Sequence, residues 1–187
     1  MAGGRIACLG SLRSALVGEH AAAARTANGL REALLCYDGR DLVDTARWQR
    51  FIAATPFARA WGRKSAPYAT TLVDMDELRV RLLYWRPGLV MPFHDHPGFD
   101  LVAMRVLGGS PLQEHVKCSL GDALGGPGIG GTTIRRELVV GDVSVIPGSR
   151  VEHRVKVKFG DMGTHTLSVE LPTTRVSDDA AEAQGAS

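Results

Sequence analysis

From Tyr68 to about Leu171 the chain falls into short runs in which apolar or β-branched residues alternate with polar ones. Turn-forming pairs such as Pro97-Gly98 and Gly108-Gly109 separate these runs. Runs of this length and alternation are typical of strands that bury one face. The expected strands cover Thr70–Val73, Leu78–Trp85, Leu101–Leu107, Gln113–Cys118, Thr132–Leu138, Asp142–Ile146, His153–Val157 and Thr164–Leu171. No helical pattern lies between them, so they predict a mainly β domain, a closed or double-sheet antiparallel barrel whose mouth is a natural small-molecule pocket.

The region before these strands has helical spacing instead. Leu30, Leu34 and Leu35 recur at the interval of helix turns, and a second apolar series runs from Leu42 to Ile52. Apolar residues at this interval form a stripe along one side of a helix. We therefore expect N-terminal helices that pack their apolar stripes on the strands.

The whole chain is expected to form one domain, because its 187 residues have the size of an ordinary single domain. Residues 1–62 form the helical region, residues 63–175 the barrel, and residues 176–187 a polar tail without core-forming residues that we expect to be disordered. The first 31 residues contain four arginines and a single acidic residue, a composition that also fits an organelle transit peptide. We favour an Ala-rich helix of the fold, or a frayed start, over organellar import.

Composition argues against several classes of protein. The 22 basic and 20 acidic residues give a net charge of +2, without the clustered positive field of a nucleic-acid binder. No run approaches the roughly 20 apolar residues of a membrane helix. The three cysteines are scattered, which favours a reducing compartment, so we expect a cytoplasmic protein. We also expect it to be a monomer. The glycine-rich residues 121–131 lack the Gly-Lys-Ser/Thr ending of a phosphate-binding loop and are interpreted as an inter-strand loop.

The most informative chemistry is the pair His94 and His96, just before Pro97-Gly98. In an extended segment, positions i and i+2 point to the same face, so both imidazoles can bind one metal ion. His153 is the best candidate for a third ligand, and His115 and His165 are its rivals. Asp100 could add a carboxylate, but we favour an ordinary turn residue.

A set of three neutral imidazoles predicts catalysis rather than a structural role. These ligands carry no charge, so they leave a divalent ion strongly Lewis-acidic with positions open to substrate. A structural zinc site is instead usually closed by four ligands and rich in thiolate. None of the three cysteines is placed to complete such a site.

Two motifs resemble those of the cupin superfamily. They are Gly88-x5-His94-x-His96 and Gly141-x5-Pro147 followed by His153. Within cupins, the order and spacing of Tyr68, Trp85, the histidines and Gly108 are similar to the thiol dioxygenases, in particular cysteine dioxygenase. The run His94-Asp-His96-Pro-Gly98 also resembles the cysteamine dioxygenases and plant cysteine oxidases. The resemblance covers about residues 66–172.

This resemblance implies a cupin-type antiparallel barrel, a double-stranded β-helix, with mononuclear non-haem Fe(II) on His94, His96 and His153. It implies that a small thiol, or the N-terminal cysteine of a peptide, reacts with dioxygen so that both oxygen atoms end on sulfur as a sulfinate. Tyr68 is a candidate hydrogen-bond donor to the substrate, and equally a candidate buried aromatic. The relay of serine, histidine and tyrosine that the family has after its third ligand aligns with Thr166, Ser168 and Glu170, and Ser168 is the second candidate catalytic residue.

The chain also departs from that family. Thr70 stands where cysteine dioxygenase has an arginine for the substrate carboxylate, and Glu170 stands where it has a tyrosine. Arg79 and Arg81 share one face of their strand, and they could replace the missing arginine if that face points inward; we favour the solvent side. Two other hypotheses stay open: a metal-dependent cupin that acts on a non-thiol small molecule, and a metal- or ligand-binding cupin without dioxygenase activity.

Overall fold

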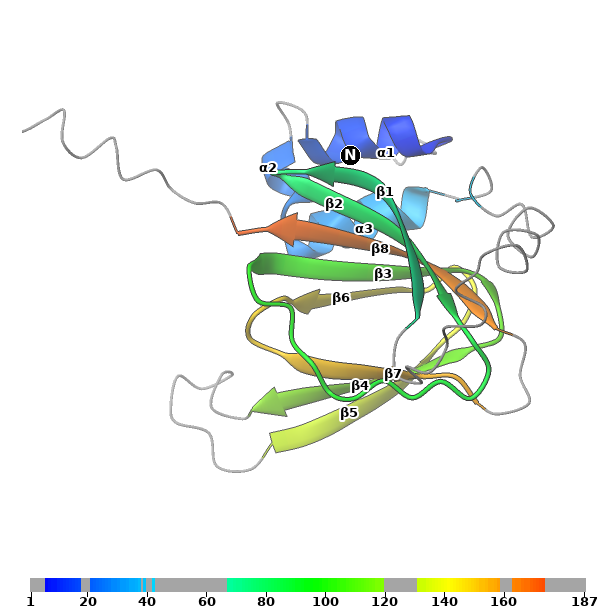
Figure 1. The fold of residues 1–187 in the computed structure, drawn as a ribbon. Helices are drawn as coiled ribbons and strands as arrows, with labels where there is room; N and C mark the ends of the chain where they lie inside the picture. Colours follow the sequence, from blue (N-terminus) through cyan, green and yellow to red (C-terminus); the bar gives the residue numbers. More distant parts are fainter. Residues whose placement is uncertain are drawn as a thin grey trace, which may run out of the picture.

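Two antiparallel β-sheets form the body of the molecule in the computed structural model, which describes residues 6–17, 21–37, 39, 42, 67–119, 131–158 and 163–173 (Figure 1). The strands are β1 (Tyr68–Met75), β2 (Leu78–Trp85), β3 (Phe99–Gly109), β4 (Leu112–Ser119), β5 (Gly131–Leu138), β6 (Val143–Pro147), β7 (Glu152–Lys156) and β8 (Thr164–Pro172). The larger sheet has the order β1-β2-β8-β3-β6, and the smaller has the order β5-β4-β7. This is the double-stranded β-helix that the sequence predicted, and the expected mainly β fold is confirmed.

The inner faces of the two sheets share one core. Leu83 and Trp85 of the larger sheet pack in one buried cluster with Leu112, Leu138 and Val155 of the smaller sheet. The larger sheet is buried on its other face as well, where Leu167 and Val169 of β8 belong to a second buried cluster.

The segment before β3 continues the smaller sheet along its edge. Met91 and Val157 exchange backbone hydrogen bonds with Val155 and Leu89, so this segment runs beside β7. An isolated antiparallel bridge then joins His94 to His153. The chain therefore brings the His94-x-His96 motif to the strand that carries the third histidine.

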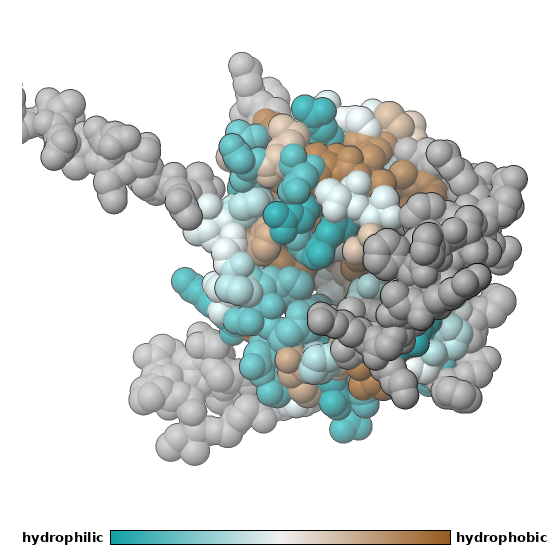
Figure 2. Space-filling model, viewed as in Figure 1, coloured by the Kyte–Doolittle hydropathy of each residue, from teal (hydrophilic) through white to brown (hydrophobic). Residues whose placement is uncertain are grey.

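Three helices cover the outer face of the larger sheet, on the side away from the smaller sheet (Figure 1): α1 (Leu9–Val17), α2 (Ala21–Ala24) and α3 (Ala27–Cys36). The cluster under the helices is composed of Leu12, Leu16, Ala24, Leu30, Leu34, Tyr37, Leu78, Val80, Ala103, Val143, Leu167, Val169 and Leu171. Figure 2 shows hydrophobic residues where this helical layer meets the strands and hydrophilic residues over the middle of the same view. The expected packing of helices on strands is therefore observed.

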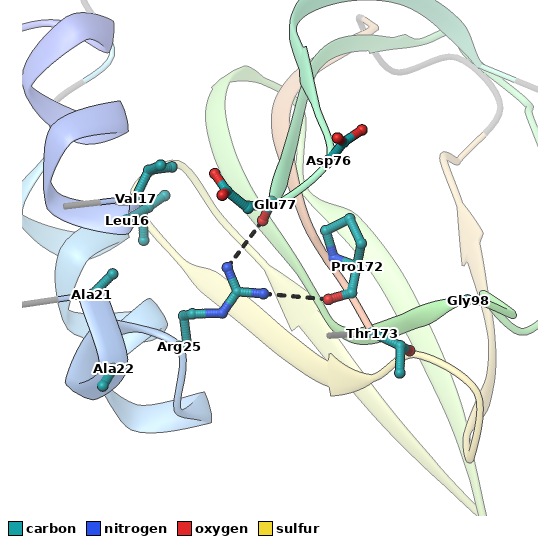
Figure 3. Close-up of a pocket in the computed structure, with 10 residues that line it drawn as sticks. All are labelled: Leu16, Val17, Ala21, Ala22, Arg25, Asp76, Glu77, Gly98, Pro172 and Thr173. Atoms are coloured by element: carbon teal, nitrogen blue, oxygen red, sulfur yellow. Dashed lines mark hydrogen bonds between the residues drawn. The ribbon is translucent and has the colours of Figure 1, made fainter. Parts of the chain in front are cut away.

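Capping and one arginine fix the helical layer. Thr26 caps α3, because its hydroxyl accepts a hydrogen bond from the backbone N–H of Gly29 at 3.0 Å. Arg25 donates to the carbonyl oxygens of Glu77 at 3.1 Å and Pro172 at 3.3 Å, across a cavity of about 1100 Å³ between helices and strand ends (Figure 3). The side chain of Leu35, expected on the buried stripe, is 43% exposed, because Leu30 and Leu34 alone occupy the inward side.

Arg79 and Arg81 lie on the inner face of β2, contrary to the preference for solvent. Their strand neighbours Leu78 and Val80 point outward, into the cluster under the helices. The helices cover the outer face of this sheet, so apolar side chains occupy that face. The charged side chains of Arg79 and Arg81 therefore point toward the barrel interior. The outer face of a sheet is exposed to solvent only where no other element packs on it.

Three other expectations concern residues outside the described part of the chain: the second helix at 42–52, apart from residue 42, the loop at 121–130 and the tail at 176–187. Within the described ranges, none of the helices has the length and apolar character needed to cross a membrane.

Candidate metal centre

His94, His96 and His153 meet at one point of the barrel, and each offers a ring nitrogen. The three ligand atoms all lie within 4.8 Å of one another. The Nε2 atoms of His96 and His153 are 3.0 Å apart, and the ring centroids of the three pairs are separated by 4.7 to 5.2 Å. In the described residues, this is the one group of three or more His, Cys, Asp or Glu side chains with such a spacing.

Backbone hydrogen bonds hold these histidines in register. The backbone N–H of His94 donates to the carbonyl of His153 at 3.0 Å, and that of His153 donates back at 2.9 Å. The N–H of His96 donates to the carbonyl of Gly148 at 2.8 Å. Gly148 is needed there because a Cβ atom would collide with the carbonyl of Phe99. The Pro147-Gly148 turn is therefore part of the framework of the site.

Two hydrogen bonds select the ring nitrogen that each histidine turns to the centre. Nδ1 of His94 lies 3.1 Å from the carbonyl oxygen of Pro92, and Nδ1 of His153 lies 2.9 Å from Oε1 of Glu114. Both partners are acceptors, so each Nδ1 carries the proton and donates. Nε2 of each ring is then left with its lone pair, which is the form that binds a metal.

Glu114 is a residue of the candidate site that our sequence analysis missed. Its side chain is 1% exposed, and it accepts hydrogen bonds from Nε of Arg136 at 2.6 Å and from Oγ of Ser144 at 2.7 Å, in addition to His153. Burial raises the pKa of Glu114, but the His153 hydrogen bond, the charge of Arg136 and the Ser144 hydrogen bond outweigh burial and lower it. The carboxylate is thus ionised and fully bonded. A signal was present: Glu114 stands two residues from both Leu112 and Val116, on the inward side of its strand.

The imidazoles of His94 and His96 are held neutral. Burial, followed by the charges of His153, His94 and Arg81, lowers the pKa of His96 to about 4. Burial is also the largest cause of the lowered pKa of His94. At neutral pH both rings therefore keep the lone pairs that a metal ion needs.

The residues present fit a divalent metal with open coordination positions. Three neutral nitrogen donors converge, and a buried carboxylate orients one of them, as in many catalytic metal centres. Soft thiolate ligands are absent from the group. Nitrogen donors of this kind suit iron, zinc, copper and nickel alike, so the donor set fits a metal ion without selecting which one.

Charged side chains of β2 and β8 lie on the same side of the larger sheet as the histidines. A terminal nitrogen of Arg81 donates to the carboxylate of Glu170, which is buried, and Arg79 lies 3.8 Å from the other oxygen of that carboxylate. Ser168, also buried, lies directly opposite Arg81 in the sheet register. The charge of Arg81 helps to lower the pKa of His96, so its guanidinium lies on the histidine side of the sheet.

No protein-family model matches this sequence, and no curated protein matches it. Solved structures do resemble it. Several of these structures are described as cupin domains or cupin proteins. A cupin domain from Bordetella pertussis has a TM-score of 0.42 and 17% identity, over 58% of this chain and 96% of that one. An RmlC-like cupin from Methanocaldococcus jannaschii has a TM-score of 0.42 and 12% identity, over 58% and 82%. A DMSP lyase from Ruegeria pomeroyi has a TM-score of 0.41 and 20% identity, over 60% of this chain and 50% of that one.

The strand register leaves the rival ligands outside the group of three histidines. His165 lies opposite Tyr84 on the outer face of the larger sheet, with ring centroids 4.9 Å apart. His115 lies on the outer face of the smaller sheet, opposite Arg154. The side chain of Asp100 is exposed and does not join the three histidines.

The two candidate catalytic residues are separated by the sheet. Ser168 shares the inner face of the larger sheet with Arg81. Tyr68 pairs with Tyr84 in register, and the two rings are stacked at 6.5 Å. Because Tyr84 points outward like Val80, the register places Tyr68 on the outer face and does not bring it to the histidines.

Proposed function

We propose that this protein is a mononuclear non-haem Fe(II) thiol dioxygenase. The observation that carries the proposal is the convergence of ring nitrogens from His94, His96 and His153 beside an inward-facing arginine. In the reaction, a thiolate and dioxygen combine to give a sulfinate, so both oxygen atoms end on sulfur and no further reductant is needed. Because all three ligands are neutral, an anionic thiolate can join the site without excess negative charge.

When bound, Fe(II) would supply adjacent coordination positions for the thiolate sulfur and dioxygen. The protein's own residues then hold and orient the reactants. His153 is kept with its proton on Nδ1 by Glu114, and His94 by the carbonyl of Pro92. The apolar residues of the inner cluster, which include Trp85 and Met104, exclude water from the rest of the interior.

Arg81 is the residue we assign to the anionic end of the substrate. One of its terminal nitrogens is bound to Glu170, but its Nε is buried without a hydrogen-bond partner among the described residues. A buried donor that lacks a partner costs about 1–3 kcal/mol, which a substrate carboxylate would offset. Arg81 would thereby replace the arginine that the family has at the place of Thr70. Ser168, opposite Arg81, is the candidate for holding a proton near the sulfur, and we assign no role in the reaction to Tyr68.

Oxygen uptake by the iron-reconstituted protein, with mass spectrometry of the products, tests this proposal. The thiols are cysteine, mercaptopropionate, cysteamine and a peptide that begins with cysteine. We expect a gain of two oxygen atoms on sulfur. If Arg81 binds a carboxylate, kcat/KM should be higher for cysteine and mercaptopropionate than for cysteamine, which has no carboxylate.

The matched control is His96→Ala, which should retain the fold but lose stoichiometric iron and oxygen uptake. If the iron-loaded protein took up no oxygen with any of the thiols, the proposal of a thiol dioxygenase would be rejected. That outcome would favour a metal-dependent reaction on a non-thiol anion, for which Arg81 is equally suited. Full iron retention by His96→Ala would instead show that the ligand set is wrong.

A further inference from the structure

The outer face of the smaller sheet contains a second polar site that the proposed reaction does not use. At its centre is His115 on β4, whose side chain is only 4% exposed although no helix of the described chain covers this face. Arg135 of β5 and Arg154 of β7 lie directly opposite His115 on its two sides. A cavity of about 350 Å³ opens here, lined by Gln113, His115, Arg135, Arg136, Glu137 and Lys156.

The charges around this cavity are not balanced within the described residues. Lys117 is paired with Glu152 at 2.5 Å, and Glu137 is within 3.4 Å of Lys158. Arg136 turns inward to Glu114. Arg135, Arg154 and Lys156 remain, and none of them has a carboxylate partner in the part of the chain that the structure describes. Arg135 and Arg154 lie on the two sides of His115, and Lys156 lies on the same face of the sheet, so their like charges repel and a counter-charge would stabilise the arrangement.

His115 adds a donor to the three cations. Nη2 of Arg154 lies 3.2 Å from Nδ1 of His115, and because an arginine can only donate, Nδ1 is the acceptor. The proton of the neutral ring is therefore on Nε2. Burial, and then the charges of Lys156, Arg154 and Arg135, lower the pKa of His115 and keep the ring neutral.

We propose that this cavity, the His115 site, binds a small phosphate-type dianion, either inorganic phosphate or the phosphate group of a small phosphorylated molecule. Arginine, lysine and a neutral imidazole N–H together supply the donors that phosphate oxygens accept. Arg135 and Lys156 line one hollow, and Arg154 lies beside it against His115. This compact arrangement, in contrast to a track along the surface, favours a compact anion over a nucleic-acid strand. The bases of a nucleic acid would stack on an aromatic ring, but the nearby ring of Phe93 is already in contact with Lys117 and Arg154.

The His115 site is distinct from the metal centre, and the inference does not rest on the proposed function. Adjacent residues of a strand point to opposite faces. Glu114 faces inward and supports His153, whereas His115 faces outward. Arg154 is likewise the outward neighbour of the inward-facing His153. The two sites therefore lie on opposite faces of the same two strands.

Isothermal titration calorimetry of the full chain with inorganic phosphate and with glycerol 3-phosphate, at constant ionic strength, tests the inference. We expect saturable binding of one anion per chain, and a shift of the His115 ring signals in NMR spectra of the same titration. Tighter binding of glycerol 3-phosphate would identify a phosphorylated molecule as the ligand. Equal or tighter binding of inorganic phosphate would identify free phosphate.

Two variants with the same loss of charge make the test specific. Arg135→Gln removes an exposed cation that lines the cavity, so it should fold normally and weaken phosphate binding by at least about 10-fold. Lys117→Gln removes a cation from the same face that is paired with Glu152 and does not line the cavity, so it should leave binding within about 2-fold. Equal losses of binding in the two variants would overturn the inference, because they would show binding of an adventitious ion only. A short oligonucleotide that binds more tightly than either phosphate would also overturn it.

Discussion

At the scale of single residues, the metal centre depends on a side chain that is not a ligand. Glu114 binds His153, Arg136 and Ser144 at once, inside a sheet where an unpaired carboxylate would be strongly unfavourable. This network fixes both the orientation of the His153 ring and the nitrogen that carries its proton. A residue of this kind acts through the ligand and positions it.

We expect Glu114→Gln to lower metal affinity by about 10- to 100-fold while most of the protein stays folded. A glutamine keeps the size of the side chain but loses the negative charge that favours the proton on Nδ1 of His153. The measurement is a titration of the metal-free protein with Co(II), followed by its absorption. Nitrogen NMR of the His153 ring, without metal, should show a changed proportion of the Nδ1-protonated form.

The control for this change is Glu137→Gln, which alters an exposed glutamate on β5 whose partner is Lys158. Its metal affinity should equal that of the original protein. If Glu114→Gln lost stability but kept both its Co(II) affinity and the His153 spectrum, Glu114 would be a purely structural residue.

At the scale of elements, the sequence predicted all eight strands within a few residues, because short alternating or β-branched runs between turn residues mark them locally. It also predicted the three histidines, because the spacing of two and the turn glycines are local features. It did not predict the direction of Arg79 and Arg81, which depends on whether helices cover the outer face of their sheet. Nor did it predict Glu114 or the outward direction of Tyr68, since both depend on strand register, which a single sequence leaves open.

Helix α3 provides the test of that covering layer. Leu34 is fully buried in the cluster beneath the helices, whereas Leu35 is the next residue and is exposed. We expect Leu34→Ala to lower the free energy of unfolding by about 2–5 kcal/mol, because it removes packed methyl groups and leaves a cavity. Leu35→Ala should change it by no more than about 0.5 kcal/mol. Denaturant unfolding of the two variants measures this difference, and equal small effects would mean that the helical layer does not contribute to the folded domain.

At the scale of the whole molecule, four histidines have lowered pKa values: His94, His96, His115 and His165. Burial is the largest cause in each case. An unfolded chain exposes these rings, and there their pKa is about 6.5. Between that value and the pKa of about 4 for His96, the unfolded chain binds protons that the folded protein does not.

The free energy of unfolding of the metal-free protein should therefore fall as the pH is lowered from about 7 to 5. The contribution of His96 is about 1 kcal/mol at pH 5, after allowance for screening by solvent at this partly exposed ring. The lowered pKa of Glu114 acts in a separate window, because its stabilisation is complete above the usual carboxyl pKa of 4.5 and is lost only below it. Urea unfolding at pH 7, 6 and 5, with a chelator and constant salt, measures the slope. His96→Gln, which cannot titrate, should show a shallower slope than the original protein, and an unchanged slope would mean that His96 is already protonated in the folded state at pH 5.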